Sequence, residues 1–418
     1  MSGAKRLERV TARVVFDSRG YKTVEVEVTV DGHSARAGAP SGKSRGKREV
    51  VPFPEGGPEA AVRFVRERFV GLVGRELDGL LAMDGLLAEL DRTPDFSAIG
   101  GNTAIALSVA AATAYAASKG KRLYEALAHL TGETPALPLP LSNVLGGGAH
   151  AGPGAPEIQE FLLIPLGART MKEAIEVNVA AYRKLGKKLQ RELPGFPLGK
   201  GDEGGYAPPI GNRKALELVR AAADEASDET GVEVGVGLDV AGSNVYDPKS
   251  GKYALRSEGL YLTGHEFRDY LASLADEFRL VYLEDPFSED SPELYAELQR
   301  DLKSVLVCGD DLVVTRAELI TEMARRGAIR AAIIKPNQVG NLSLTLEAIR
   351  ACASTGAVAV ASHRSGETTD AYISQVAVGT GCKVIKCGLI GGERVAKLNE
   401  LLRIEEEVGE GRIRRLKP

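Results

Sequence analysis

Residues 305–335 of the chain read VLVCGDDLVVTRAELITEMARRGAIRAAIIK. Two short apolar runs flank a helical pattern in this stretch: residues 305–309 end at Asp310, and residues 331–334 end at Lys335. Between them, residues 315–326 carry apolar side chains at helical spacing. Strands that alternate with helices in this way predict strand–helix–strand units and a parallel sheet.

The same pattern recurs through the second part of the chain. Six apolar runs each end in one polar residue of a catalytic type, namely Asp239, Glu284, Asp310, Lys335, His363 and Lys386. The last five are about 25 residues apart, close to the roughly 30 residues of one strand and one helix in an eight-unit α/β barrel. Further helical patterns cover residues 342–353 and 393–407. We therefore expect a (β/α)8-type barrel.

The carboxyl ends of barrel strands converge at one mouth, where barrel enzymes place their active sites. Taken alone, each of the six polar residues has about even odds of simply ending a strand. Their common register at six successive strand ends favours one shared pocket.

The first part of the chain has a different rhythm. Residues 23–30 alternate apolar and polar side chains, which predicts a half-buried strand, with further strands over 13–16 and ending near 39–40. Helical patterns then cover 59–90 and 102–117. Strands followed by helices predict a smaller α+β capping domain over 1–134, carrying a mobile active-site loop, ahead of a catalytic barrel domain over 135–418.

Composition limits the class of protein and its partners. The 418 residues include 44% hydrophobic and 26% charged residues and carry a net charge of -4, so nothing global favours a nucleic acid or a membrane as partner. The four cysteines form no Cys-x-x-Cys pair, which argues against zinc and disulfide frameworks. With a charged N-terminus that lacks the apolar run of a signal peptide, these features predict a cytoplasmic protein.

Three carboxylates, Asp239, Glu284 and Asp310, stand at successive strand ends without a histidine or cysteine among them. All-oxygen ligand sets suit hard cations, and Mg²⁺ best fits a site that also binds substrate oxygens. Lys335 and Lys386 follow on later strands, and a desolvated lysine beside a dication can act as a base. The pattern predicts removal of a weakly acidic proton beside a carboxylate, with the metal stabilising the enediolate.

Glu203 lies in the run GDEGG over residues 201–205. Flanking glycines allow the backbone to approach a ligand closely, so this carboxyl group could be a general acid for a leaving hydroxyl. A plain turn with a solvated acid is the alternative for this run taken alone.

These segments together resemble the enolases, or phosphopyruvate hydratases, over nearly the whole chain. The resemblance is carried by FDSRG (16–20), PSGKS (40–44), GGGAHA (146–151), QEF (159–161), GDEGG (201–205), GLDVA (237–241), EDP (284–286), GDD (309–311), KPNQVG (335–340), SHRSGET (362–368) and IK (385–386). The runs GDEGG and SHRSGET are the most specific. The resemblance implies an enolase-type barrel whose first units are modified.

The resemblance also implies a role for each site residue. Asp239, Glu284 and Asp310 would hold the tighter Mg²⁺, and Ser44 would ligate a second one. Lys335 would be the base, while Glu203, helped by Glu160, would promote loss of the hydroxyl group. The pocket would be completed by His150, His363, Arg364, Ser365 and Lys386, with Arg364 and Ser365 on the phosphate and Lys386 on the carboxylate.

The substrate pair implied by the resemblance is 2-phosphoglycerate and phosphoenolpyruvate, handled by a homodimer or an octamer of dimers. The chain departs from the family pattern at Lys43 and Arg45, which replace alanine and threonine, at Asn244, and in a shorter segment after Lys386. Two alternatives therefore stay open: a superfamily relative that acts on another acid, such as an acid-sugar dehydratase, and a non-catalytic binding protein on the same fold.

Overall fold

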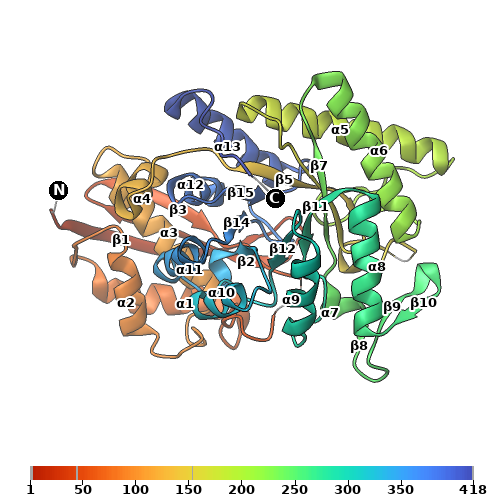
Figure 1. The fold of residues 1–418 in the computed structure, drawn as a ribbon. Helices are drawn as coiled ribbons and strands as arrows, with labels where there is room; N and C mark the ends of the chain where they lie inside the picture. The colour runs from red at the N-terminus through yellow and green to blue at the C-terminus, as the bar shows by residue number, and fades with distance from the viewer. Residues whose placement is uncertain (1–2, 44–45, 153, 417–418) are drawn as a thin grey trace.

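The structure is a computed structural model that describes residues 3–43, 46–152 and 154–416. Its N-terminal region contains a four-stranded antiparallel sheet in the order β3-β2-β1-β4. The strands are β1 (Lys5–Phe16), β2 (Lys22–Val30), β3 (His33–Gly38) and β4 (Glu76–Leu77). Four helices accompany the sheet on the left of Figure 1: α1 (Gly57–Arg68), α2 (Ala82–Leu90), α3 (Gly101–Ala117) and α4 (Leu123–Thr131).

The alternation in β2 has the predicted effect, because Val24, Val26, Val28 and Val30 are all fully buried. Helix α3 packs on β2 and β3 and is buried along almost its whole length. Its residues are mostly alanine and other small side chains, which allow close packing of the helix on all sides.

The helical pattern predicted over residues 59–90 forms two helices with a break between them. Helix α1 ends at Arg68, and a 3-10 turn η1 (Phe69–Leu72) and the short strand β4 separate it from α2. Gly74 lies in this break with a φ of +95°, a conformation that an α-helix cannot contain. Strand β1 also begins earlier than predicted, at Lys5, since Lys5 and Arg6 pair with β4 before the rest of the strand pairs with β2.

Eight described strands close the predicted barrel in the order β11-β12-β13-β14-β15-β5-β6-β7. They are β5 (Leu139–Gly146), β6 (Glu160–Ile164), β7 (Gly235–Asp239), β11 (Leu280–Glu284), β12 (Leu306–Gly309), β13 (Ala331–Ile334), β14 (Val358–Ser362) and β15 (Val384–Lys386). Strand β6 runs antiparallel to both of its neighbours, β5 and β7, whereas the remaining pairs are parallel. The first units are therefore modified, as expected.

The remaining helices cover the outside of the barrel (Figure 1). They are α5 (Met171–Glu192), α6 (Asn212–Thr230), α8 (Gly264–Glu277), α9 (Pro292–Asp301), α10 (Ala317–Arg325), α11 (Leu342–Thr355), α12 (Tyr372–Gly379) and α13 (Gly392–Val408). The helical patterns at 315–326, 342–353 and 393–407 are confirmed by α10, α11 and α13. Between β7 and α8 the chain forms a short helix, α7 (Gly242–Val245), and a small sheet. The sheet consists of β8 (Tyr246–Asp247), β9 (Lys252–Leu255) and β10 (Leu260–Leu262).

Loops of the N-terminal region reach the carboxyl ends of the barrel strands. Ser41 forms a bridge with Gly366, and the Val50 amide donates to the carbonyl of Gln338. Asn102, in the first turn of α3, accepts a hydrogen bond from Asn337 at 3.0 Å. The N-terminal region therefore contributes to the covering of the barrel mouth.

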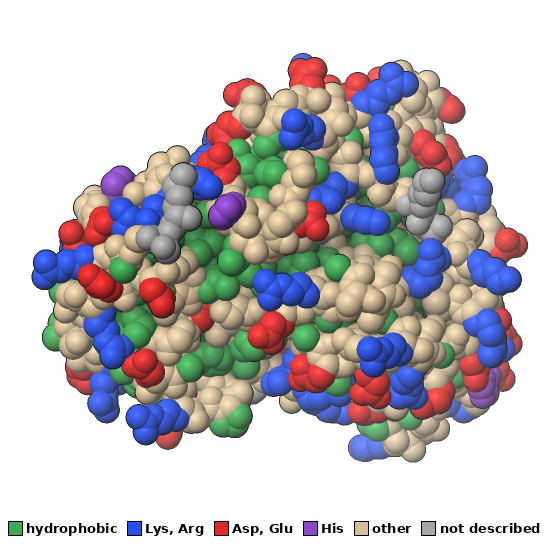
Figure 2. All heavy atoms as spheres, turned by 60° about the vertical axis from the view of Figure 1, so that its left-hand side comes forward, with side chains coloured by type: hydrophobic (Ala, Val, Ile, Leu, Met, Phe, Trp, Pro, Cys, Tyr) green, Lys and Arg blue, Asp and Glu red, His purple; other side chains and the backbone are tan. Residues whose placement is uncertain are grey.

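Within the described ranges, no helix has the length and apolar character needed to cross a bilayer. On the face that Figure 2 shows, basic and acidic side chains are interspersed with hydrophobic ones. A mixed face of this kind differs from the continuous basic surface that nucleic-acid-binding proteins present.

Candidate active site

The six polar residues predicted at strand ends do meet at one mouth. Asp239, Glu284 and Lys386 are the last residues of β7, β11 and β15, while Asp310, Lys335 and His363 each follow directly after a strand. One pocket is lined by most of the predicted site residues, namely His150, Glu160, Glu203, Asp239, Asp310, Lys335, His363, Arg364, Ser365 and Lys386. Glu284 is fully buried beside them, and Ser44 lies outside the described residues.

Lys386 joins the carboxylates at the bottom of the pocket. Its Nζ lies 2.8 Å from both Asp239 Oδ2 and Glu284 Oε1, and 3.2 Å from Glu160 Oε1. Tyr282 donates a hydrogen bond of 2.8 Å to the other oxygen of Glu284. Lys386, expected on the substrate carboxylate, thus contacts the predicted metal ligands themselves in this structure.

The electrostatics of this carboxylate group suit a dication. Burial, with the charges of Asp239 and Asp310 adding to it, raises the pKa of Glu284 to about 8. Asp239 and Glu284 share one cationic partner, Lys386, which balances their charge in this structure. Buried carboxylates that repel each other and offer only oxygen atoms fit Mg²⁺.

Lys335 forms an ion pair with Asp310, whose other oxygen accepts a hydrogen bond of 3.3 Å from Gln338. Burial is the largest single effect and lowers the pKa of Lys335, but the negative charges around it, chiefly those of Asp310 and Glu284, together hold the pKa above its usual value. A base needs a lowered pKa, but the ion pair with Asp310 opposes this lowering for Lys335, since a neighbouring negative charge favours the ammonium form.

Asp285 was missed by the sequence reasoning, although it lies in the quoted EDP run. Its two carboxylate oxygens accept hydrogen bonds from the backbone amides of Asp310 and Asp311, at 2.9 and 2.7 Å. Oxygens of Asp285, Asp310 and Asp311 lie within 4.8 Å of one another, so this group could also hold a metal ion. Among the described residues, Asp310 thus lies in this group, whereas Asp239, Glu284 and Asp310, the predicted ligands, do not come within 4.8 Å of one another as a set of three.

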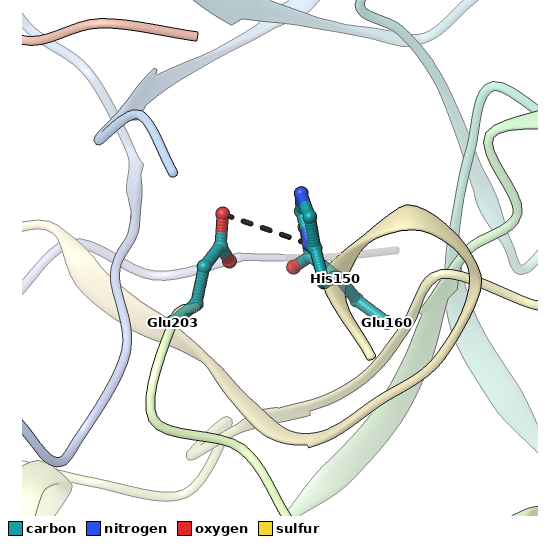
Figure 3. Close-up of side chains that lie close together, drawn as sticks. All are labelled: His150, Glu160 and Glu203. Atoms are coloured by element: carbon teal, nitrogen blue, oxygen red, sulfur yellow. Dashed lines mark ion pairs between the residues drawn. The ribbon is translucent and has the colours of Figure 1, made fainter. Parts of the chain in front are cut away.

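A second cluster faces the pocket from the 3-10 turn η2 (Gly148–His150), β6 and the GDEGG loop. His150 Nδ1 lies 3.7 Å from Glu160 Oε1 and 3.8 Å from Glu203 Oε1, and both carboxyl groups point toward the imidazole in Figure 3. These three side chains could themselves hold a cation. Burial, together with the nearby charge of Glu203, raises the pKa of Glu160 well above its usual range. Burial and the neighbouring charge therefore favour the protonated form of Glu160 beside Glu203.

Several buried polar atoms around Glu203 lack a hydrogen-bond partner among the described residues. They include His150 Nδ1, Glu160 Oε2 and His363 Nε2. Buried polar groups without partners are rare in folded proteins and point to a bound water, ion or ligand. This side of the pocket is therefore suited to a polar ligand.

Arg364 and Ser365 lie at the entrance, beside loops of the N-terminal region. Arg364 Nη1 donates to Asn337 at 3.0 Å and pairs with buried Glu49 at 3.3 Å, and Arg19 donates to Ser365 Oγ at 3.3 Å. These contacts give the pocket a cationic rim that can meet an anionic group. Glu49 could not be found from the sequence, because it stands in a basic stretch far from any strand end.

Lys43, one of the departures from the family pattern, forms an ion pair of 2.9 Å with Asp202 of the GDEGG loop. Asn244, another departure, donates to Gln159 at 3.3 Å. Arg45 lies outside the described residues. Lys43 therefore links the loop at 41–43 directly to the loop that carries Glu203.

Gly204 fixes the backbone of that loop. Its φ is +84°, and a Cβ atom at this position would overlap the carbonyl oxygen of Ile390. We expect Gly204→Ala to lower the free energy of unfolding by about 1–2 kcal/mol from the left-handed backbone and by about 1–3 kcal/mol more from the overlap. Chemical denaturation measures this loss.

Gly195→Ala is the matched control, because its φ is +93° but nothing lies within 4 Å of the added carbon. It should lose only the backbone contribution. Equal destabilisation of the two variants would contradict a close approach between Gly204 and Ile390.

Comparison with known proteins gives the same assignment along the chain. The model of the family described as "Enolase, N-terminal domain" matches residues 7–127, and that of "Enolase, C-terminal TIM barrel domain" matches residues 134–414. An enolase of Methanosphaera stadtmanae is 45% identical over 405 residues, covering 96% of this chain and 97% of the relative. Enolases of Methanothermobacter thermautotrophicus, at 42% over 404 residues, and Pyrobaculum aerophilum, at 43% over 408 residues, cover at least 95% of each chain. The chain therefore belongs to the enolase family.

Proposed function

We propose that this chain is a lyase that catalyses the reversible dehydration of 2-phosphoglycerate to phosphoenolpyruvate. The observation that carries the proposal is the meeting, in one pocket, of a buried lysine and a buried glutamate with a set of carboxylates, in a chain that matches the enolase family end to end. The curated relatives that span nearly the whole chain bear the name enolase.

Lys335 is the base in this proposal, and in its neutral form takes the proton from C2 of the substrate. The electron pair of that C–H bond then forms the C2–C3 double bond as the C3–O bond breaks. Glu203 and Glu160 lie together beside His150 in the pocket (Figure 3). The raised pKa of Glu160 favours its protonated form, which supports the role of this pair in protonating the leaving hydroxyl. Water is the second product.

Asp239, Glu284 and Asp310 would hold Mg²⁺, whose positive charge stabilises the dianionic carboxylate that forms when C2 is deprotonated. Ser44 is proposed for a second Mg²⁺. His150 and His363 line the pocket, and Lys386 has the charge to meet the substrate carboxylate. Arg364 and Ser365, on the cationic rim, are suited to the phosphate. A guanidinium can donate two parallel hydrogen bonds to phosphate oxygens. An unphosphorylated acid would offer no phosphate to Arg364 and Ser365.

The whole-chain organisation completes the proposal. We propose that residues 1–134 form the smaller capping domain and residues 135–418 the catalytic domain. We also propose that the chain assembles as a homodimer or an octamer of dimers. All four cysteines lie among the described residues as buried free thiols, which supports a reducing, cytoplasmic setting. Light scattering coupled to size exclusion tests the oligomeric state.

Turnover should depend on Mg²⁺. We expect phosphoenolpyruvate, detected by its ultraviolet absorbance, to form from 2-phosphoglycerate with Mg²⁺ present, to stop forming in excess chelator, and to form again when Mg²⁺ is restored. The reason is that buried Glu284 and its neighbours need a dication beside the substrate carboxylate.

D-gluconate, a six-carbon sugar acid without phosphate, is the control substrate. It should give no product under the same conditions. Turnover of the sugar acid in place of 2-phosphoglycerate would favour a superfamily relative, and Mg²⁺ binding without turnover of either would favour a non-catalytic protein.

A further inference from the structure

Arg394, in the first turn of α13, is a fully buried cation close to the pocket but not in its lining. Its guanidinium lies between two loops of the site. Nη1 contacts His363 Nδ1 at 2.7 Å and donates to the carbonyl of Arg364 at 2.7 Å. Nη2 donates to the carbonyls of Ser365, at 2.7 Å, and Asp202, at 3.1 Å.

The contact with His363 determines which ring nitrogen carries the proton. A guanidinium has five N–H donors and no acceptor, and it stays protonated inside proteins. Nδ1 must therefore accept the hydrogen bond from Arg394, and the backbone amide of Gly388 donates weakly to the same nitrogen at 3.5 Å. The proton of the neutral imidazole is left on Nε2.

The Nε2 atom of His363 faces the catalytic cluster. It lies 3.2 Å from Glu203 Oε2, and the same carboxylate accepts a hydrogen bond of 3.2 Å from Asn143. Burial lowers the pKa of His363 to about 4, with Glu203 opposing this and Arg394 adding to it, so the ring is neutral at physiological pH. The neutral ring presents an N–H group, rather than a lone pair, to Glu203.

The carbonyl contacts of Arg394 link the two loops that carry these side chains. Arg364 and Ser365 follow His363 in the chain, and Asp202 precedes Glu203. One guanidinium therefore fixes the backbone on both sides of the His363–Glu203 pair. Glu393 lies 3.2 Å from Arg394 Nε and provides the counter-charge.

We propose that Arg394 is a positioning residue that holds His363 as the Nε2–H tautomer facing Glu203 and joins the loops of the two side chains. The inference rests on the proposed function, since Glu203 promotes loss of the hydroxyl group in that reaction. The Nε2–H group places the positive end of its dipole 3.2 Å from Glu203 Oε2, which favours the ionised carboxylate.

The state of His363 can be read directly by NMR. The chain has five histidines, so a protein labelled with ¹⁵N only at histidine gives few signals, and a His363→Gln variant identifies those of His363. The ¹⁵N shifts of the two ring nitrogens distinguish which one is protonated. We expect the proton on Nε2 in the wild type at neutral pH, and a proton on Nδ1 would overturn the proposal without any Arg394 variant.

Arg394→Met should remove the preference for Nε2–H, so that His363 shows mixed tautomers, and lower kcat by about 10- to 100-fold, the usual effect of losing a partner that orients a catalytic histidine. Arg394→Lys, which keeps the buried charge and one donor nitrogen, should recover part of both. Unchanged tautomer and kcat in a folded Arg394→Met protein would overturn the proposal.

Lys397→Met is the matched control. Lys397 is equally buried, lies one turn along α13, and donates to the carbonyls of Thr368 and Asp370 at 3.2 and 2.8 Å. It holds the next part of the same loop but does not contact the His363 ring. We expect this variant to lose stability and to keep the Nε2–H tautomer, whereas a tautomer change as large as that of Arg394→Met would overturn the specific role of Arg394.

The NMR result does not depend on turnover. A wild-type protein that lacks the dehydratase reaction but shows Nε2–H at His363 would contradict the proposed function alone. The placement of the proton by Arg394 would still be supported.

Discussion

Lys335→Ala should lose about 10²- to 10⁴-fold of kcat, the usual contribution of a positioned general base. Lys335 directly follows β13 and is half-buried with its ammonium on Asp310, and alanine leaves no group there that can accept the C2 proton. Mg²⁺ affinity should not fall, because the substitution removes a competitor for Asp310 and no metal ligand.

The loss can be assigned to proton removal by following exchange of the C2 proton with deuterium from the solvent. Lys335→Ala should lose this exchange together with product formation. Glu203→Gln is the matched variant: it should lose product formation yet keep exchange at C2, because Lys335 is untouched. Exchange that persists in Lys335→Ala would mean that another group is the base, and Lys386 would be the first to test.

The register of the polar strand ends is what made the site predictable from the sequence. Because parallel strands in a barrel end at the same mouth, a residue such as Asp239 or Lys386 can be placed near the others without knowledge of any distance. The structure confirms this at all six positions. The pattern does not reveal which of these side chains contact one another, because those contacts join strands from different sides of the barrel.

The orientation of β6 could not be predicted from periodicity. All five residues of β6 and all eight of β5 are buried, so neither strand shows the alternation that reports a solvent-facing side. A fully buried run is compatible with either direction. Only the resemblance indicated that the first units are modified.

Arg394 was missed for a related reason. In a helical pattern a charged residue is normally assigned to the solvent face, yet Arg394 and Lys397 lie on the same buried face of α13 as Leu398 and Leu401. Their partners are backbone carbonyls of a loop that is close only in the folded chain. Buried cations of this kind are visible in the sequence only as interruptions of an apolar stripe.

Asp310→Asn should weaken Mg²⁺ binding by more than about 100-fold. Loss of a residue that only hydrogen-bonds to a metal ligand already weakens affinity by about 10- to 100-fold, and Asp310 is proposed as a ligand itself. The substitution replaces a charged oxygen ligand by a neutral amide in a buried site where carboxylates repel each other. Titration calorimetry measures the affinity, and an unchanged titration would mean that Asp310 does not bind the metal.

Because Asp310 belongs to both possible ligand groups, two further variants are needed to locate the ion. Glu284→Gln removes a ligand of the predicted group, and Asp311→Asn removes one of the alternative group with Asp285. Both replacements keep the size of the side chain and remove one buried carboxylate. We expect a large loss of affinity in Glu284→Gln and a small one in Asp311→Asn. The reverse order would put the ion against Asp285 and Asp311, and Lys386 would then remain the cation that balances Asp239 and Glu284.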